Sequence, residues 1–151
     1  MSLLIKNLAF VFFLTFTNLC QAEVLLHPLD GKPISFASLK GKWVLINYWA
    51  SWCQPCLDEI EELNHFYAAR KEEVALFAVN FDKQSLSIQQ GLVDKYKIAY
   101  PSLRIDPAKS LNLGHIQGVP ATFIFNKEGK LAHILYGGQN QNNLNKVLAK
   151  G

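Results

Sequence analysis

Residues 47–56 of the chain read Asn-Tyr-Trp-Ala-Ser-Trp-Cys-Gln-Pro-Cys, and this stretch decides the fold. It follows an apolar run over residues 43–49, which predicts a strand covered on both faces of a sheet. From residue 53 to residue 69 the pattern becomes helical. The predicted inward stripe of that helix consists of Cys53, Cys56, Ile60, Leu63 and Tyr67. A pair of cysteines therefore lies where a buried strand ends and a helix begins.

The segments on either side of this stretch predict the rest of the domain. Residues 24–29 and 34–36 flank the turn sequence Asp-Gly-Lys-Pro and predict a short β-hairpin. We predict further strands at residues 74–80, 122–125 and 131–136, helices at 86–96 and 142–150, and one or two helical turns at 108–113. This order predicts an α/β fold with a mixed central sheet and helices on both faces.

The spacing of the two cysteines has a chemical meaning at this position. Cys53 begins the helix, where unpaired N–H groups and the helix dipole favour a negative charge. This setting lowers the pKa of a thiol below its ordinary value of about 8.5. Cys56 follows one helical turn later, near enough for a disulfide, and Pro55 suits the first turn of a helix. The expected cycle is attack by Cys53 on a partner disulfide, followed by resolution of the mixed disulfide by Cys56.

Two other interpretations of a Cys-x-x-Cys motif are weaker here. A zinc site needs further ligands, but residues 23–151 contain no second cysteine pair and the histidines show no ligand spacing. A purely structural disulfide across two intervening residues contributes little loop-closure stabilisation. The position between strand and helix favours redox chemistry.

Composition limits the classes of protein that remain. The chain has 151 residues, which is the length of one domain, and 50% of them are hydrophobic while 18% are charged. These values exclude a disordered chain, a collagen-like repeat and a disulfide-dense miniprotein. A net charge of +3 without a Lys or Arg cluster does not indicate nucleic acid or an anionic membrane as a partner. The cysteine count of three is odd, which does not suit a set of stable disulfides.

The first 22 residues are typical of a cleaved export signal. Lys6 precedes an apolar run at residues 8–16, which is much shorter than the ~20 residues of a spanning helix. Cys20 and Ala22 are small residues three and one positions before a predicted cut after Ala22. The alternatives are a retained membrane anchor, a buried N-terminal helix, or a lipoprotein signal at Cys20. Cleavage leaves a domain at residues 23–151 with one cysteine pair, and places it in the periplasm.

The stretch at residues 47–56 resembles the active-site segment of the thioredoxin superfamily, and in particular the exported TlpA/ResA/DsbE (CcmG)-type thiol–disulfide oxidoreductases. Residues 29–43 are similar to the N-terminal hairpin extension of that branch. Residues 118–123, Gly-Val-Pro-Ala-Thr-Phe, resemble its proline loop. By itself, a proline before a strand marks a turn or a strand start. The resemblance implies that Pro120 is cis and shields the sulfurs, and that the backbone of Val119 pairs with substrate.

Glu59 lies three residues after Cys56 and is a second candidate for chemistry. A glutamate is usually solvated at the surface. The resemblance implies instead that this carboxylate lies near the cysteine pair and either assists proton transfer or tunes the thiols. Asn47 occupies the position where ordinary thioredoxins carry a buried aspartate as proton acceptor, and an amide cannot titrate. Glu59 is therefore the candidate replacement.

The aromatic and polar neighbours of the pair complete the predicted site. Trp49 lies in the apolar strand and is predicted to belong to the core. Trp52 directly precedes Cys53 and is predicted to be an exposed contact for protein substrates. We assign Gln54 and Pro55, between the cysteines, to the same substrate-binding surface.

The resemblance implies a monomeric reductant of protein disulfides that uses no cofactor other than the Cys53–Cys56 pair. It further implies apocytochrome c as a substrate and a DsbD-type membrane reductase as electron donor. A copper metallochaperone of the same fold is one alternative, but such proteins separate the cysteines by three residues and add a placed histidine, whereas His115 has no ligand motif around it. A thiol peroxidase of the same fold is another. The sequence does not determine the direction of electron flow.

Overall fold

The three-dimensional structure is a computed structural model that describes residues 23–150. The predicted export signal at residues 1–22 lies outside the described residues. Within residues 23–150, no helix has the length and apolar character needed to cross a bilayer.

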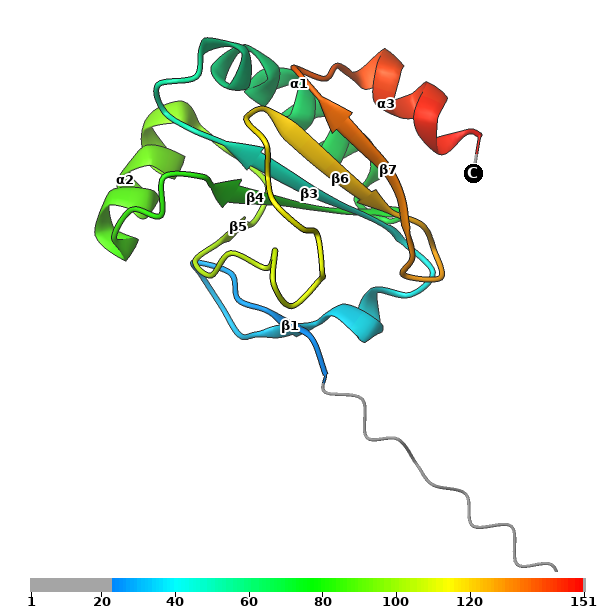
Figure 1. The fold of residues 1–151 in the computed structure, drawn as a ribbon. Coiled ribbons are helices and arrows are strands. Elements are labelled where there is room, and N and C mark those ends of the chain that lie inside the picture. Colours follow the sequence, from blue (N-terminus) through cyan, green and yellow to red (C-terminus); the bar gives the residue numbers. More distant parts are fainter. Residues whose placement is uncertain (1–22, 151) are drawn as a thin grey trace, which may run out of the picture.

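A five-stranded mixed sheet forms the centre of the domain, as predicted (Figure 1). Its strands, in spatial order, are β5 (Ser102–Leu103), β4 (Val74–Asn80), β3 (Trp43–Trp49), β6 (Ala121–Phe125) and β7 (Leu131–Tyr136). Strand β3 runs parallel to β4 and antiparallel to β6. Every residue of β3 is buried, because this central strand is covered on both faces. The two-residue strand β5 was not predicted, since so short a run has no recognisable periodicity.

The three α-helices are α1 (Gln54–Arg70), α2 (Leu86–Tyr96) and α3 (Gln141–Leu148). Buried or partly buried apolar side chains from each of them pack into one core cluster, together with one face of the sheet. The other face is covered by the 3-10 helix η1 (Phe36–Leu39) and by the loop that contains Leu113 and Ile116. The prediction of helices on both faces is corrected in this respect, because the second face carries η1 and a loop in place of an α-helix.

The predicted N-terminal hairpin is present and consists of β1 (Leu25–Leu26) and β2 (Ile34–Ser35). Its first strand is shorter than expected because the residues after it pair with β5 instead. The amide of Leu29 donates to the carbonyl of Ser102 at 2.7 Å, and Pro28 forms an isolated bridge with Leu103. The hairpin extension thus covers an edge of the sheet that would otherwise expose unpaired backbone groups.

Residues 108–112 form hydrogen-bonded turns, and one of them has the predicted helical spacing, because the amide of Leu111 donates to the carbonyl of Pro107 at 2.8 Å. The amide of Leu113 donates to the carbonyl of Ala108, five residues back, at 2.9 Å. Asn112 has a φ of 53° and Gly114 a φ of 74°, so the backbone leaves the right-handed helical region. The segment is held instead by Asp106, which accepts hydrogen bonds from Tyr48 Oη at 2.7 Å and from the amide of Ala108 at 2.9 Å.

Candidate active site

The two cysteines lie at the junction between β3 and α1, as the sequence predicts. They form a disulfide with a Cα–Cα distance of 5.3 Å. Cys53 is the N-cap of α1, and its Sγ accepts a hydrogen bond from the amide of Cys56 at 3.3 Å. This amide lies in the first turn of the helix and also donates to the carbonyl of Cys53 at 3.0 Å. Its position at the helix N-terminus favours negative charge on the sulfur of Cys53.

The two sulfurs differ in access. Cys53 is 5% exposed, whereas Cys56 is 0% exposed and lies within the core cluster. Cys53 is therefore the more accessible of the two cysteines to a substrate. This difference fits the predicted order, in which Cys53 attacks and Cys56 resolves.

The proline loop lies at the start of β6. The peptide bond between Val119 and Pro120 is cis, as the resemblance implied. The carbonyl of Pro120 accepts a hydrogen bond from the amide of Gly137 at 2.9 Å, which joins this loop to the end of β7. Val119 packs against the core cluster that contains both cysteines. The substrate contacts predicted for Val119 and Pro120 remain predictions.

Glu59 is buried in α1 and is only 3% exposed, so it is not a solvated surface residue. Its Oε1 accepts a hydrogen bond from Asn47 Nδ2 at 2.8 Å, and its Oε2 accepts one from the amide of Gln139 at 2.8 Å. Asn47 Nδ2 also donates to Thr122 Oγ1 at 3.2 Å. The carboxyl group is therefore held by β3 and by the segment that precedes α3, one turn of helix from Cys56.

The inward face of α1 is wider than the stripe of residues predicted from the sequence. Its buried residues include Glu59 and Phe66 in addition to Cys56, Ile60 and Leu63, and Tyr67 is only partly buried. The helix packs against α3 as well as against the sheet, and this second contact widens the buried face.

Burial raises the pKa of Glu59 to about 7 from an ordinary value of 4.5. The hydrogen bonds from Asn47 and from the backbone of Gln139 favour the charged form and offset part of this rise. Among residues 23–150, the ion pair between Arg70 and Glu73 is the only one within 4.0 Å, so no cation compensates the burial of Glu59. Tyr100 is also buried, which raises the pKa of its phenol, and the nearby Glu59 charge raises it further.

The raised pKa of Glu59 predicts how the stability of the disulfide form depends on pH. The folded protein binds this proton more tightly than the unfolded chain does. The resulting contribution to the free energy of unfolding, about 3 kcal/mol by the factor of 1.36 kcal/mol per pKa unit, is fully present below pH 4.5 and is lost as the pH rises through 7.

Urea unfolding of the wild type and of Glu59→Gln between pH 4 and pH 8 measures this contribution. We expect the wild type to lose stability relative to the variant as the pH rises through that interval. A difference between the two proteins that stays constant with pH would contradict the prediction.

Trp52 and Trp49 lie as the sequence predicts. Trp52 is 66% exposed next to Cys53, and Trp49 is buried at 2%. The indole Nε1 of Trp52 donates to Asp82 Oδ1 at 2.8 Å. Gln54 is exposed and its Nε2 donates to Asp58 Oδ1 at 2.7 Å.

Three groups that contact predicted site residues were not predicted from the sequence: Thr122, Gln139 and Asp82. They lie 75, 80 and 30 residues from their partners Asn47, Glu59 and Trp52, so no local pattern connects them. Gln139 donates a hydrogen bond to Glu59 from its backbone amide, and a backbone contact of this kind cannot be predicted from the type of residue at position 139.

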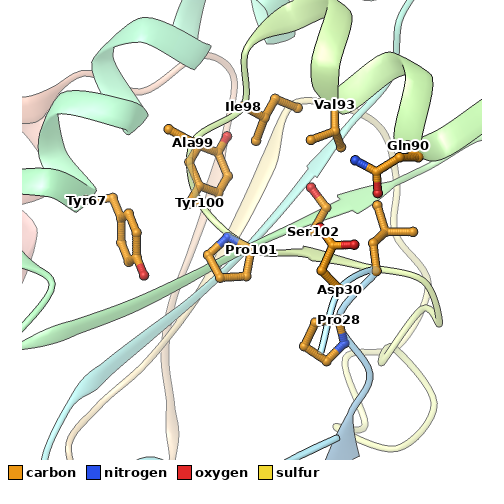
Figure 2. A pocket seen from close by; sticks show the side chains of 11 residues that line it. Pro28, Asp30, Tyr67, Gln90, Val93, Ile98, Ala99, Tyr100, Pro101 and Ser102 are labelled. Atoms are coloured by element: carbon orange, nitrogen blue, oxygen red, sulfur yellow. The ribbon is translucent and has the colours of Figure 1, made fainter. Parts of the chain in front are cut away.

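One cavity near the hairpin is separate from the cysteine pair. It has a volume of about 360 Å³ and lies between the turn at residues 28–30 and the segment that leads into β5. Figure 2 shows the side chains that line it, among them Pro28, Asp30, Tyr100 and Ser102. None of its lining residues is a predicted site residue. Within residues 23–150, no group of three or more His, Cys, Asp or Glu side chains forms a potential metal site.

A cysteine pair at a strand-to-helix junction, with a cis-proline loop packed against the same cluster, defines a thioredoxin-like thiol–disulfide protein. Comparison with known sequences agrees. Residues 15–134 match the AhpC/TSA family, and the chain belongs to this family.

Particular relatives narrow this assignment. The thiol–disulfide oxidoreductase ResA of Bacillus cereus is 30% identical over 123 residues, which cover 81% of this chain and 70% of that protein. Among solved structures, StoA from Bacillus subtilis is similar with 25% identity and a TM-score of 0.68, covering 82% of this chain and 93% of its own. A DsbF homologue from Corynebacterium diphtheriae is similar with 26% identity and a TM-score of 0.72, covering 85% and 84%. The chain is therefore a thiol–disulfide oxidoreductase of the ResA/StoA/DsbE type, as the resemblance implied, and its reaction is exchange with the thiol and disulfide groups of proteins.

Proposed function

We propose that the protein acts as a reductant of disulfides in exported proteins. The observation that carries this proposal is the buried carboxyl group of Glu59, which lies one turn of α1 after Cys56 and is held by Asn47. A negative charge held there opposes a second negative charge on sulfur and raises the pKa of a neighbouring thiol. A dithiol that is less stabilised as thiolate is more easily oxidised. The Cys53–Cys56 pair is therefore a better electron donor with the Glu59 charge than it would be without it.

The reaction consists of two exchanges at sulfur. The thiolate of Cys53 attacks one sulfur of the substrate disulfide, and the other substrate sulfur leaves as a thiolate that takes up a proton. Cys56 then loses its proton and attacks Cys53 Sγ, which releases the second substrate sulfur. The substrate disulfide is reduced to two thiols, and the protein dithiol is oxidised to the Cys53–Cys56 disulfide.

Glu59 supports the second exchange by accepting the proton of Cys56. Cys56 is fully buried, so water is a poor acceptor for this proton. A base works best when its pKa lies near the working pH, and burial brings the pKa of Glu59 to about 7. The hydrogen bonds from Asn47 and Gln139 orient the carboxylate in its unprotonated form.

Location and partners form part of the same proposal. The N-terminal segment at residues 1–22 supports export to the periplasm, with membrane anchoring if the segment is retained. Resemblance to the branch supports apocytochrome c as the substrate and a DsbD-type membrane reductase as the donor that restores the dithiol. Purified apocytochrome c with its two haem-binding cysteines oxidised is the direct test substrate. If the reduced protein reduces insulin but not oxidised apocytochrome c, apocytochrome c is excluded as a substrate, while the proposed reductase activity stands.

The equilibrium reduction potential of the Cys53–Cys56 pair tests the direction. We expect a value near or below about −270 mV, the range of cytosolic thioredoxin, by equilibration with glutathione or dithiothreitol buffers. A value near −120 mV, which is typical of a strong oxidant, would overturn the proposed direction.

Two measurements examine the other functions open to this fold. Equilibrium copper binding by the reduced protein would indicate a metallochaperone. Turnover of hydrogen peroxide that depends on Cys53 would indicate a thiol peroxidase.

A further inference from the structure

An exposed aromatic side chain beside the reactive cysteine is held in place by a group from the loop that follows β4. Trp52 is 66% exposed, whereas Trp43 and Trp49, the other tryptophans of the chain, are 4% and 2% exposed. An exposed ring without a partner samples several rotamers. Here the indole N–H donates to Asp82 Oδ1 at 2.8 Å, so the ring has one preferred orientation next to Cys53.

Asp82 is itself tied to the strand that leads to the active site. It follows β4, whose last residue, Asn80, lies opposite Trp49 at the end of β3. Asn80 Oδ1 accepts a hydrogen bond from the amide of Asp82 at 3.0 Å, and the amide of Phe81 donates to the carbonyl of Trp49 at 2.9 Å. The end of β3, the Asp82 loop and Trp52 therefore form a closed set of contacts.

Stability alone does not account for these polar groups. Asp82 Oδ2 and Asn80 Nδ2 are buried and have no hydrogen-bond partner among residues 23–150. Asp82 forms no ion pair among the same residues. Buried polar atoms without partners destabilise the folded state. The hydrogen bond to Trp52 is the one contact that the Asp82 carboxylate makes to another side chain in the described part of the chain.

We propose that Asp82 is a positioning residue for the thiol–disulfide exchange. By holding the indole of Trp52, it presents a fixed apolar platform beside Cys53 for the polypeptide segment that flanks the target disulfide. A side chain ordered before binding loses less entropy in the complex, so the platform favours protein disulfides over small ones. This inference rests on the proposed function, because it assumes that a polypeptide binds at Cys53.

The test compares Asp82→Ala, Asp82→Asn and Asp94→Ala. Asparagine keeps an oxygen that can accept the indole hydrogen bond but removes the charge. Asp94 is an exposed acid on α2 that accepts a side-chain hydrogen bond from Gln90, so its replacement is a matched control. Far-UV circular dichroism and a urea midpoint establish that each variant is folded.

Indole N–H resonances give the readout of position. We expect Asp82→Ala to shift the signal of Trp52, assigned with Trp52→Phe, and to leave those of Trp43 and Trp49 in place. In insulin reduction with dithiothreitol as the recycling reductant, KM should rise about three- to tenfold in Asp82→Ala with little change in kcat. The rise should exceed any change in the rate with DTNB, a small disulfide without a polypeptide. Asp82→Asn should recover most of the loss, and Asp94→Ala should match the wild type.

Three results would overturn the inference: an unchanged Trp52 resonance in Asp82→Ala, an equal loss with insulin and DTNB, or no recovery in Asp82→Asn. The last result would assign the effect to the charge and not to the hydrogen bond. Failure of the wild-type protein to reduce insulin at all would instead count against the proposed reductase function.

Discussion

Replacing Cys56 by serine is expected to stop the reaction at the mixed disulfide and to lower turnover of a protein disulfide by at least about a thousandfold. Cys53 remains at the N-terminus of α1 and still attacks the substrate. Serine cannot supply the second sulfur, so the covalent adduct has no internal route to release. The burial of Cys56 strengthens this expectation, because an external thiol cannot easily enter the buried position of residue 56 to release the adduct.

Mass spectrometry and non-reducing gels after incubation of the reduced variant with oxidised substrate measure the adduct. Cys53→Ser is the matched control and should form no adduct, since the remaining cysteine of the domain is inaccessible. Near wild-type turnover by Cys56→Ser, or an adduct linked through Cys56 in Cys53→Ser, would reverse the assignment of the two roles. The same Cys56→Ser variant, used on extracts of exported proteins, would identify the substrates.

Replacing Glu59 by glutamine is expected to slow the resolving step by about a hundredfold at neutral and higher pH. In the wild type the rate of resolution should rise as Glu59 loses its proton at a pH of about 7. The rise of the rate near pH 7 should be absent from the pH profile of the variant. The resolution rates of the wild type and the variant should approach each other as the pH falls below 7. Loss of the carboxylate should also lower the pKa of the thiols, because the negative charge no longer opposes their ionisation.

Stopped-flow measurement of mixed-disulfide decay and pH titration of the Cys53 and Cys56 thiols check these two effects. Glu61→Gln is the matched control, because Glu61 is exposed on the same helix. Glutamine preserves the size of the side chain and an oxygen for Asn47, so the helix should keep its position. Thiol pKa values and a resolution profile that match the wild type would remove Glu59 from the mechanism.

Much of the fold could be predicted because its signals are local. The apolar run that forms β3, the start of α1 at the cysteine pair and the hairpin before β3 each lie within a short window of sequence. The segment at residues 108–113 was predicted to form one or two helical turns, and its structure contains one hydrogen bond of helical spacing, from Leu111 to Pro107, before the helical pattern ends. Its backbone instead follows the left-handed conformation of Asn112 and the contacts of Asp106, which join it to Tyr48.

The candidate site also contains some residues that local sequence predicts and others that it does not. Spacing alone identified Cys53 and Cys56, because a disulfide across two residues and a helix N-terminus are both local features. Resemblance identified the loop of Pro120. The environment of Glu59 could not be predicted from spacing, since a side chain at the position three residues after Cys56 can face either solvent or the core. The packing of α3 against α1 places it in the core.

The sequence by itself determined the class of chemistry: one cysteine pair, at the end of a buried strand and the start of a helix, in a domain preceded by a segment typical of export. Only the tertiary structure decided what surrounds that pair. It buried Glu59 between Asn47 and the amide of Gln139, and it brought Asp82 to the indole of Trp52. The physical reason is that secondary-structure periods extend over a few residues, whereas these hydrogen bonds join groups 12 to 80 residues apart that meet only when the sheet and its helices are assembled.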